Sequence, residues 1–87
     1  MLDIGHGLIM DIRETFALNL RRYRQAAGLS QEELAARAGI HRTYVSALER
    51  CQYSATIDMV DGLARILGVT AADLLNPDGG GEPGGQS

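Results

Sequence analysis

The sequence predicts an all-α fold, a compact domain of five helices with a helix-turn-helix at its centre. Apolar residues recur at spacings of three and four along most of the chain, which is the period of an amphipathic helix. Residues that cap helix N-termini precede these segments, and glycines follow them. No segment alternates polar and apolar residues as a half-buried strand does, and no internal repeat is visible.

Length and composition fit one small domain. The 87 residues, 45% of them hydrophobic, suit a globular protein whose small core would gain from a partner subunit. No apolar run approaches the roughly 20 residues that span a bilayer, and the first residues lack the basic and apolar regions of a signal peptide. The single cysteine excludes an internal disulfide and suits a reducing cytosol. We therefore expect a cytoplasmic protein with no membrane partner.

Three parts follow from the local composition. Residues 1–10 contain two glycines and no helical period, so they are interpreted as an N-terminal extension, with Met10 as an alternative start. Residues 11–76 carry the helical pattern and form the folded domain. Residues 77–87 are rich in glycine and are expected to be a flexible tail.

The first helix is expected to begin at Asp11, because Asp11 and Glu14 form an acidic capping pair suited to a helix N-terminus. Gly28 ends this helix. Leu18 lies off its apolar stripe and is expected to be exposed. The stripe itself is made by Ile12, Phe16, Leu20, Tyr23 and Ala27.

Two short amphipathic segments meet at Gly39 and form the centre of the chain. Ser30 and Glu33 have the spacing of a capping box, so the first segment begins beside Ser30. Gly39 follows that segment where a left-handed residue would turn the chain. In the second segment Val45 and Leu48 face inward together. A helix, a short turn and a second helix form a helix-turn-helix.

Two more helices are predicted after this unit. Thr56 caps a fourth helix, which Gly68 ends, and Gly62 inside it is explained either by close packing against a neighbouring helix or by tolerance. Thr70 begins a short fifth helix, and Pro77 prevents its continuation. The inward stripe of the fourth helix is expected to be Ile57, Val60, Leu63, Ala64 and Leu67.

The stretch 31–50 resembles the DNA-binding helix-turn-helix of phage repressors and Cro proteins, the XRE family. The resemblance runs from about Phe16 to Leu75 and implies a fold like that of lambda repressor, with double-stranded DNA as the partner. Arg42, Thr43 and Tyr44 most resemble the controller proteins of restriction–modification systems. The residues that carry the resemblance are Gln31, Leu34, Ala35, Gly39, Ile40, Val45, Leu48 and Glu49.

The distribution of charge along the chain is more informative than the net charge. A net charge of −3 argues against binding to nucleic acid. Residues 21–50, however, carry six arginines against three glutamates, and the chain has no lysine. Arginine suits bidentate contact with phosphate and guanine. Positive charge therefore gathers on the helix-turn-helix, unless these arginines only decorate a solvated surface.

Base-reading residues are expected on the outward side of the second helix of this unit, which should enter the major groove N-terminus first. Arg42 projects from its first turn and can bond O6 and N7 of one guanine. With Val45 and Leu48 inward, a rotation of about 100° per residue turns the opposite side outward. The expected base readers are Arg42, Thr43, Ser46 and Ala47, and the resemblance places readers at the same positions.

Phosphate contacts are expected from polar side chains around this helix. Gln31 stands at a helix N-terminus, where backbone N–H groups support an anion contact. Two interpretations stand for His41, a phosphate contact or a weak helix cap. Arg21 and Arg22 likewise have two interpretations, as phosphate contacts or as solvated charges. The full set of candidates is Gln31, His41, Tyr44, Arg50, Tyr53, Arg21 and Arg22.

Two further expectations come from the resemblance. It implies a structural ion pair between Arg24 and Glu49, although Arg24 has an alternative interpretation as a phosphate-facing cation. Family members usually have glycine where Cys51 stands, so either the helix runs longer here or the turn differs. Cys51 itself has two interpretations, a redox switch or the small inert packing residue that a lone cysteine usually is.

One module of this size gives little specificity, and the family resemblance implies a homodimer that binds a palindromic site. Val69, Leu74 and Leu75 are candidates for the dimer interface, and Leu74 and Leu75 could equally belong to the core. No metal-ligand spacing, cofactor motif, nucleophile–base set or ligand-sensing segment is present, so neither an enzyme nor a small-molecule ligand is expected.

The function predicted is a sequence-specific transcriptional regulator of bacterial type, a repressor or controller. The alternative is a module of the same fold, such as an antitoxin, whose main role is to bind a protein partner. The overall acidity favours this alternative, whereas the arginines on the outward side of the helix-turn-helix disfavour it.

Overall fold

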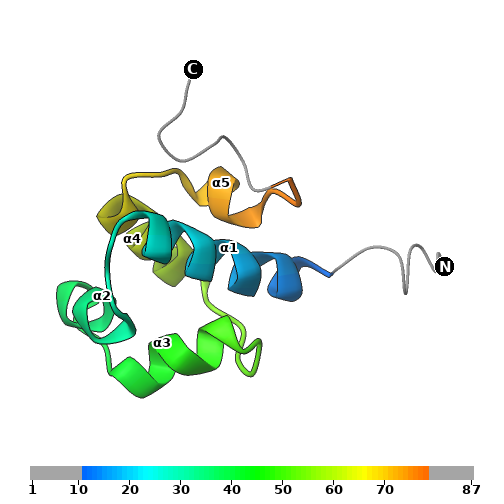
Figure 1. The fold of residues 1–87 in the computed structure, drawn as a ribbon. Coiled ribbons are helices and arrows are strands. Elements are labelled where there is room, and N and C mark those ends of the chain that lie inside the picture. The colour runs from blue at the N-terminus through cyan, green and yellow to red at the C-terminus, as the bar shows by residue number, and fades with distance from the viewer. Residues whose placement is uncertain (1–10, 79–87) are drawn as a thin grey trace, which may run out of the picture.

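The computed structural model describes residues 11–78 and contains five helices within them, with no strand (Figure 1). The helices are α1 (Ile12–Ala26), α2 (Gln31–Ala38), α3 (Arg42–Glu49), α4 (Ile57–Leu67) and α5 (Ala71–Leu75). The all-α prediction is confirmed. The expected N-terminal extension, its alternative start at Met10 and the tail beyond residue 78 lie outside the described residues. None of the described helices has the length and apolar character needed to cross a membrane.

The helices begin and end where the local sequence chemistry directs them. Asp11 and Ser30 each accept a hydrogen bond from a backbone N–H of the first turn, and each forms a capping box with the glutamate three residues later. At the end of α2, Gly39 has a φ of 72°, which a residue with a side chain adopts only with strain. The chain can therefore turn sharply from α2 into α3.

One leucine from each helix meets in the core. These five side chains are almost fully buried, with exposed fractions of 0–1%. Because every helix contributes one of them, the core joins all five elements, including the five-residue α5, which would not be stable alone. The leucines are Leu20, Leu34, Leu48, Leu63 and Leu74.

Helix α1 packs against a different helix on each of two sides. Helix α1 contacts α3 on one side and α5 on the other, and α4 contacts α2 and α5. In Figure 1, α3 and α5 accordingly lie on opposite sides of α1. The helix-turn-helix of α2 and α3 thus occupies one face of the domain, and α4 and α5 form another.

Three residues assigned to the apolar stripes are exposed. Ile12 is 60% exposed and Ile57 is 84% exposed, and Ala27 also lies on the surface, so their expected burial is wrong. Ile12 and Ile57 are the first residues of α1 and α4, and Ala27 follows the last residue of α1. The helical period gives the direction of a side chain, but the neighbouring helices do not extend far enough to cover these ends. Leu18, expected to be exposed, is 42% exposed.

Gly62 is not a site of close helix packing. A Cβ atom built there would meet no atom within 4 Å, apart from chain neighbours and the backbone of its own helix. Of the two explanations for this glycine, close packing is wrong, and tolerance remains.

Candidate nucleic-acid interface

Helix α3 presents its first turn to solvent. His41 precedes the helix with extended backbone angles, and its side chain makes no capping hydrogen bond. Arg42 and Thr43 follow and are exposed, and Ser46, one turn later, is half-buried. A guanidinium and a hydroxyl are thereby placed together at the leading end of a helix whose other side is anchored in the core.

Ala47 does not belong to this exposed surface. Its exposed fraction is 5%, so the expectation that its side chain points outward is wrong. Both α1 and α2 contact α3, and two neighbours bury a wider arc of the helix than the single stripe of Val45 and Leu48. The methyl group of Ala47 lies inside that arc and is not available to a base.

An ion pair holds α3 against the helices behind it. The Nε of Arg24 lies 2.6 Å from Oε2 of Glu49, and its Nη2 donates to Oε1 at 3.0 Å. A third guanidinium nitrogen, Nη1, donates to the carbonyl oxygen of Leu29 at 2.8 Å. The side chains are 10% and 3% exposed, respectively. Hydrogen bonding to Glu49 raises the pKa of Arg24, because it stabilises the charged guanidinium despite burial. The two residues are placed as the family resemblance implied.

Gln31 joins the same cluster. Its Nε2 donates to Oε1 of Glu49 at 3.1 Å, so one carboxylate connects α1, α2 and α3. A carboxamide nitrogen carries two hydrogens, and this bond uses one of them. Gln31 is half-buried at the first position of α2, so its amide is held in one orientation by the protein itself.

Two tyrosines lie near one another, Tyr44 in the first turn of α3 and Tyr53 in the loop that follows the helix. The ring centroids of Tyr44 and Tyr53 lie 6.1 Å apart, and Tyr53 is 60% exposed. Arg50 is exposed between them in sequence, and its Nη2 donates to the side-chain oxygen of Gln52 at 3.1 Å. Three of the expected phosphate contacts thus lie on α3 or in the segment that follows it, with the ring of Tyr53 near that of Tyr44.

Arg21 and Arg22 are both exposed but face different neighbours. Arg21 lies one turn before Arg24 on α1, on the side that faces α3. The charge of Arg22 instead acts on Tyr23. The pKa of Tyr23 is raised by burial and by the nearby charge of Asp73 in α5, an effect that Arg22 opposes. Arg22 is thus on the side of α5, where the solvated-charge interpretation fits better.

Cys51 adopts the left-handed turn that glycine usually makes. Its φ is 60°, and α3 ends at Glu49. The N–H of Cys51 donates to the carbonyl of Leu48 at 3.1 Å, and that of Gln52 donates to the carbonyl of Ala47 at 2.8 Å. Both expected explanations, a longer helix and a different turn, are therefore wrong. The thiol is exposed and free, and the described residues contain no group that could hold a metal ion.

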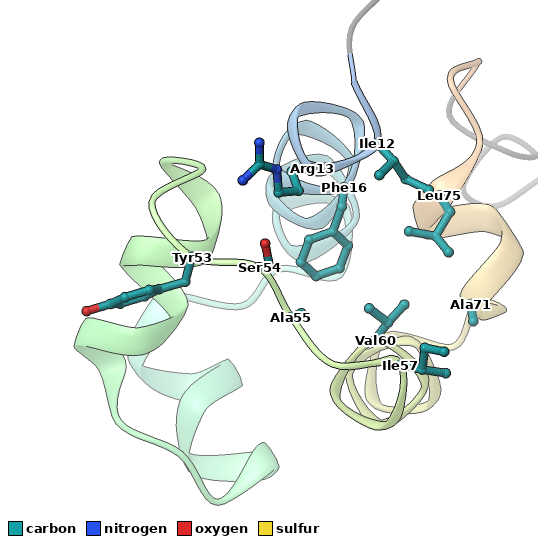
Figure 2. Close-up of a pocket in the computed structure, with 10 residues that line it drawn as sticks. All are labelled: Ile12, Arg13, Phe16, Tyr53, Ser54, Ala55, Ile57, Val60, Ala71 and Leu75. Atoms are coloured by element: carbon teal, nitrogen blue, oxygen red, sulfur yellow. The ribbon is translucent and has the colours of Figure 1, made fainter. Parts of the chain in front are cut away.

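A second surface feature lies between α1, α4, α5 and the loop that joins α3 to α4, which contributes Tyr53, Ser54 and Ala55. An apolar groove with a volume of about 200 Å³ opens there, and Figure 2 shows Ile12, Ile57 and Leu75 around it. Leu74, one of the expected dimer residues, is 0% exposed, so its assignment to an interface is wrong: it fills the core. Leu75 lines the groove and is half-buried, as is Val69, which packs against the core elsewhere.

Comparison with known proteins gives a consistent result. The helix-turn-helix family HTH_3 matches residues 20–74. The chain is 45% identical over 67 residues to a hypothetical transcription factor of Neisseria meningitidis serogroup B, covering 77% of this chain but 63% of that protein. It is 41% identical over 70 residues to the control protein C.SmaI of Serratia marcescens, covering 80% of this chain and 83% of that one.

Solved structures share the fold. The crystal structure of the hypothetical transcription factor NHTF from Neisseria has a TM-score of 0.74, 45% identity and 77% coverage of each chain. The structure of SinR, a master regulator for biofilm formation, in complex with DNA has a TM-score of 0.66 and 31% identity. That likeness covers 70% of this chain and 98% of the other.

Proposed function

This chain belongs to the helix-turn-helix family HTH_3, a family of DNA-binding transcriptional regulators of the XRE type, and we propose that it reads a palindromic operator as a homodimer. The observation that carries the proposal is the exposed first turn of α3, a helix whose other end is fixed by the Arg24–Glu49 pair. A reading helix must hold its side chains in one geometry, and this helix is anchored at both the core and the ion pair.

In the proposed complex, α3 enters the major groove with its N-terminus leading. Arg42 bonds O6 and N7 of a guanine, and Thr43 offers its methyl group to a thymine and its hydroxyl to a base edge. Ser46 is half-buried and contributes a hydroxyl further along the helix. Discrimination therefore rests mainly on the two exposed residues of the first turn.

Phosphate contacts in the proposed complex surround these readers. The amide of Gln31 is already oriented by Glu49, so it loses little freedom when its second N–H meets a phosphate. Tyr44 and Tyr53 present two hydroxyls from neighbouring rings, and Arg50 adds a charge. His41 and Arg21 complete the set. Two of the three glutamates in residues 21–50 do not oppose these cations freely, since Glu49 pairs with Arg24 and Glu33 caps α2.

The proposed homodimer uses the apolar groove. Ile57 is the most exposed large apolar residue described, and Ile12 and Leu75 share its groove. A second copy would remove these side chains from water, and the small single core of one chain gains from such burial. Since α5 and α3 lie on opposite sides of α1, a dimer formed on this face leaves the first turn of α3 free in both subunits, and Tyr53 at the rim of the groove lies where the dimer and the phosphate contacts meet. Val69 is half-buried and does not line the groove, so it stays a candidate only for an interface that extends beyond the groove.

Relatives support the proposal without deciding its details. SinR was crystallised with DNA, and C.SmaI is described as a control protein. The net charge of −3 and the exposed apolar groove favour one competing function, a module that binds another protein through the groove. Regulation by DNA binding is preferred because Arg42 and Thr43 are exposed together at the first turn of α3, the part of a reading helix that meets the major groove.

Selection of binding sites from random duplex DNA, followed by gel shifts at two salt concentrations, tests the proposal. We expect the full chain to enrich a palindrome and to bind it more weakly at the higher salt concentration. Enrichment of a sequence without two-fold symmetry would overturn the palindromic site. Failure to bind any duplex at low salt would favour the partner-binding module instead.

A further inference from the structure

Asn19 is a buried amide that the helical pattern does not explain. It lies in α1 with an exposed fraction of 1%. Its Nδ2 donates to the backbone carbonyls of Leu74 at 3.0 Å and Asn76 at 2.9 Å, with a longer contact of 3.4 Å to that of Asp73. The last carbonyls of a helix have no partner within it. Asn19 supplies that partner for α5 from another helix.

Helix α5 depends on such contacts because it is short. It has five residues, and a capping box between Thr70 and Asp73 closes its N-terminal end. Leu74 fixes its position through the core, and Asn19 closes its C-terminal end. An internal side chain of α1 therefore determines where α5 stops and how the chain leaves it.

Leu75 stands between two of the carbonyls that Asn19 holds. Its backbone is fixed on both sides, at Leu74 and Asn76. In Figure 2 its side chain lies at the groove, on the same side as Ile12. We infer that Asn19 is a positioning residue for self-association: it sets the place of Leu75 on the face where a second copy docks. The inference rests on the homodimer proposed above.

The chemistry of the amide makes the inference testable. Each carbonyl needs a donor, and an amide nitrogen provides two hydrogens. A serine at this position keeps one donor on a shorter arm, whereas an aspartate has nearly the shape of asparagine but carries two acceptors. We expect Asn19→Ser to loosen the end of α5 and Asn19→Asp to repel it.

Sedimentation equilibrium of the full chain measures the dimer dissociation constant in each variant, at a temperature where circular dichroism shows it folded. We expect Asn19→Ser to raise this constant by about tenfold, and Asn19→Asp to raise it further if it folds. The control is Ser30→Ala, which removes the cap of α2 at a distance from α5 and lowers stability without moving Leu75. Its dissociation constant should stay within about twofold of the parent.

A double-mutant cycle with Leu75→Ala separates positioning from general stability. If Asn19 acts through Leu75, adding Asn19→Ser to Leu75→Ala should raise the dissociation constant by much less than about tenfold. Full additivity, or an Asn19→Ser protein that dimerises like Ser30→Ala, would overturn the inference and leave the dimer intact. A parent chain that stays monomeric would overturn the dimer and the inference together, whereas the gel shift decides DNA binding by itself.

Discussion

Arg24 and Glu49 meet at two points, with Nε–Oε2 and Nη2–Oε1 distances of 2.6 Å and 3.0 Å, and their side chains are almost completely shielded from water. Such a pair contributes little net stability compared with apolar packing, but a single charge left alone in that place is costly. Because Glu49 also accepts a hydrogen bond from Gln31, the pair is the point at which three helices are joined behind the exposed end of α3.

Glu49→Ala should lower the free energy of unfolding by about 3–5 kcal/mol, because it leaves the Arg24 guanidinium buried without its partner. Urea denaturation measures this change. Sites selected by the protein that remains folded should match those of the parent, since Glu49 is not among the exposed readers. Glu32→Ala is the control: Glu32 is exposed in α2, and its loss should change stability by at most about 0.5 kcal/mol. Equal stability of the two variants would contradict the structural role of the pair.

Arg42→Ala should weaken binding to the selected operator more than binding to random DNA, by about 1–3 kcal/mol of discrimination. The reason is that the exposed guanidinium at the first turn of α3 contacts a base in the proposed complex, and random DNA seldom offers that base. Titrations of both DNA molecules at one salt concentration measure the difference.

Gln31→Ala is the matched comparison for Arg42. Its amide meets a phosphate in the proposed complex, so operator and random DNA should lose the same factor of affinity. Equal losses on the two DNA molecules for Arg42→Ala would make Arg42 a phosphate contact, and a changed base preference for Gln31→Ala would contradict its assigned role.

Cys51→Gly should raise the free energy of unfolding by about 1 kcal/mol, because glycine adopts a φ of 60° without the strain that a side chain causes. Thermal melting measures the gain. Cys51→Ala controls for the loss of the thiol, since alanine keeps the Cβ atom and should give no comparable gain. If both variants were stabilised equally, the thiol rather than the backbone would be the cause.

Helix positions were predictable from the sequence because caps and stops act locally. Ser30, Glu33 and Gly39 specify α2 through contacts within a few residues, and the structure places the helix between them. The extent of burial was not predictable in the same way. Ala47 is buried in a helix that contacts both α1 and α2, whereas Ile57 at the start of α4 is 84% exposed although it shares a groove with residues of α1 and α5. Both facts depend on how far a neighbouring element extends.

Contacts between side chains that lie far apart in the sequence were even harder to predict. Arg24 and Glu49 are 25 residues apart, and only the family resemblance suggested the pair. Asn19 and the end of α5 are more than 50 residues apart. The sequence shows only that the polar residue Asn19 stands next to Leu20 of the apolar stripe. Nothing in the sequence identifies the carbonyls that Asn19 binds. The groove likewise arises only when α1, α4, α5 and the loop before α4 come together.

The proposed dimer should place two reading helices on half-sites about one DNA turn apart, roughly 34 Å. Affinity should fall steeply with salt, because each phosphate neutralised over both subunits adds about 0.9 to the log–log slope. A variant that cannot dimerise should show about half of that slope on a single half-site. Salt titrations on full and half operators measure both slopes, and equal slopes on the two would contradict binding by two subunits.

Ile57→Glu should give a chain that cannot dimerise. Ile57 is 84% exposed in the single chain, so a charge there should change the stability of the monomer by only about 0.5 kcal/mol or less. Against a second copy, the same carboxylate would be buried without a partner, so the dimer should dissociate and operator affinity should fall. Leu18→Glu is the control, because Leu18 is also an exposed apolar residue but does not line the groove. A dimer that persists in Ile57→Glu but is lost in Leu18→Glu would move the interface away from the groove and toward the outer side of α1.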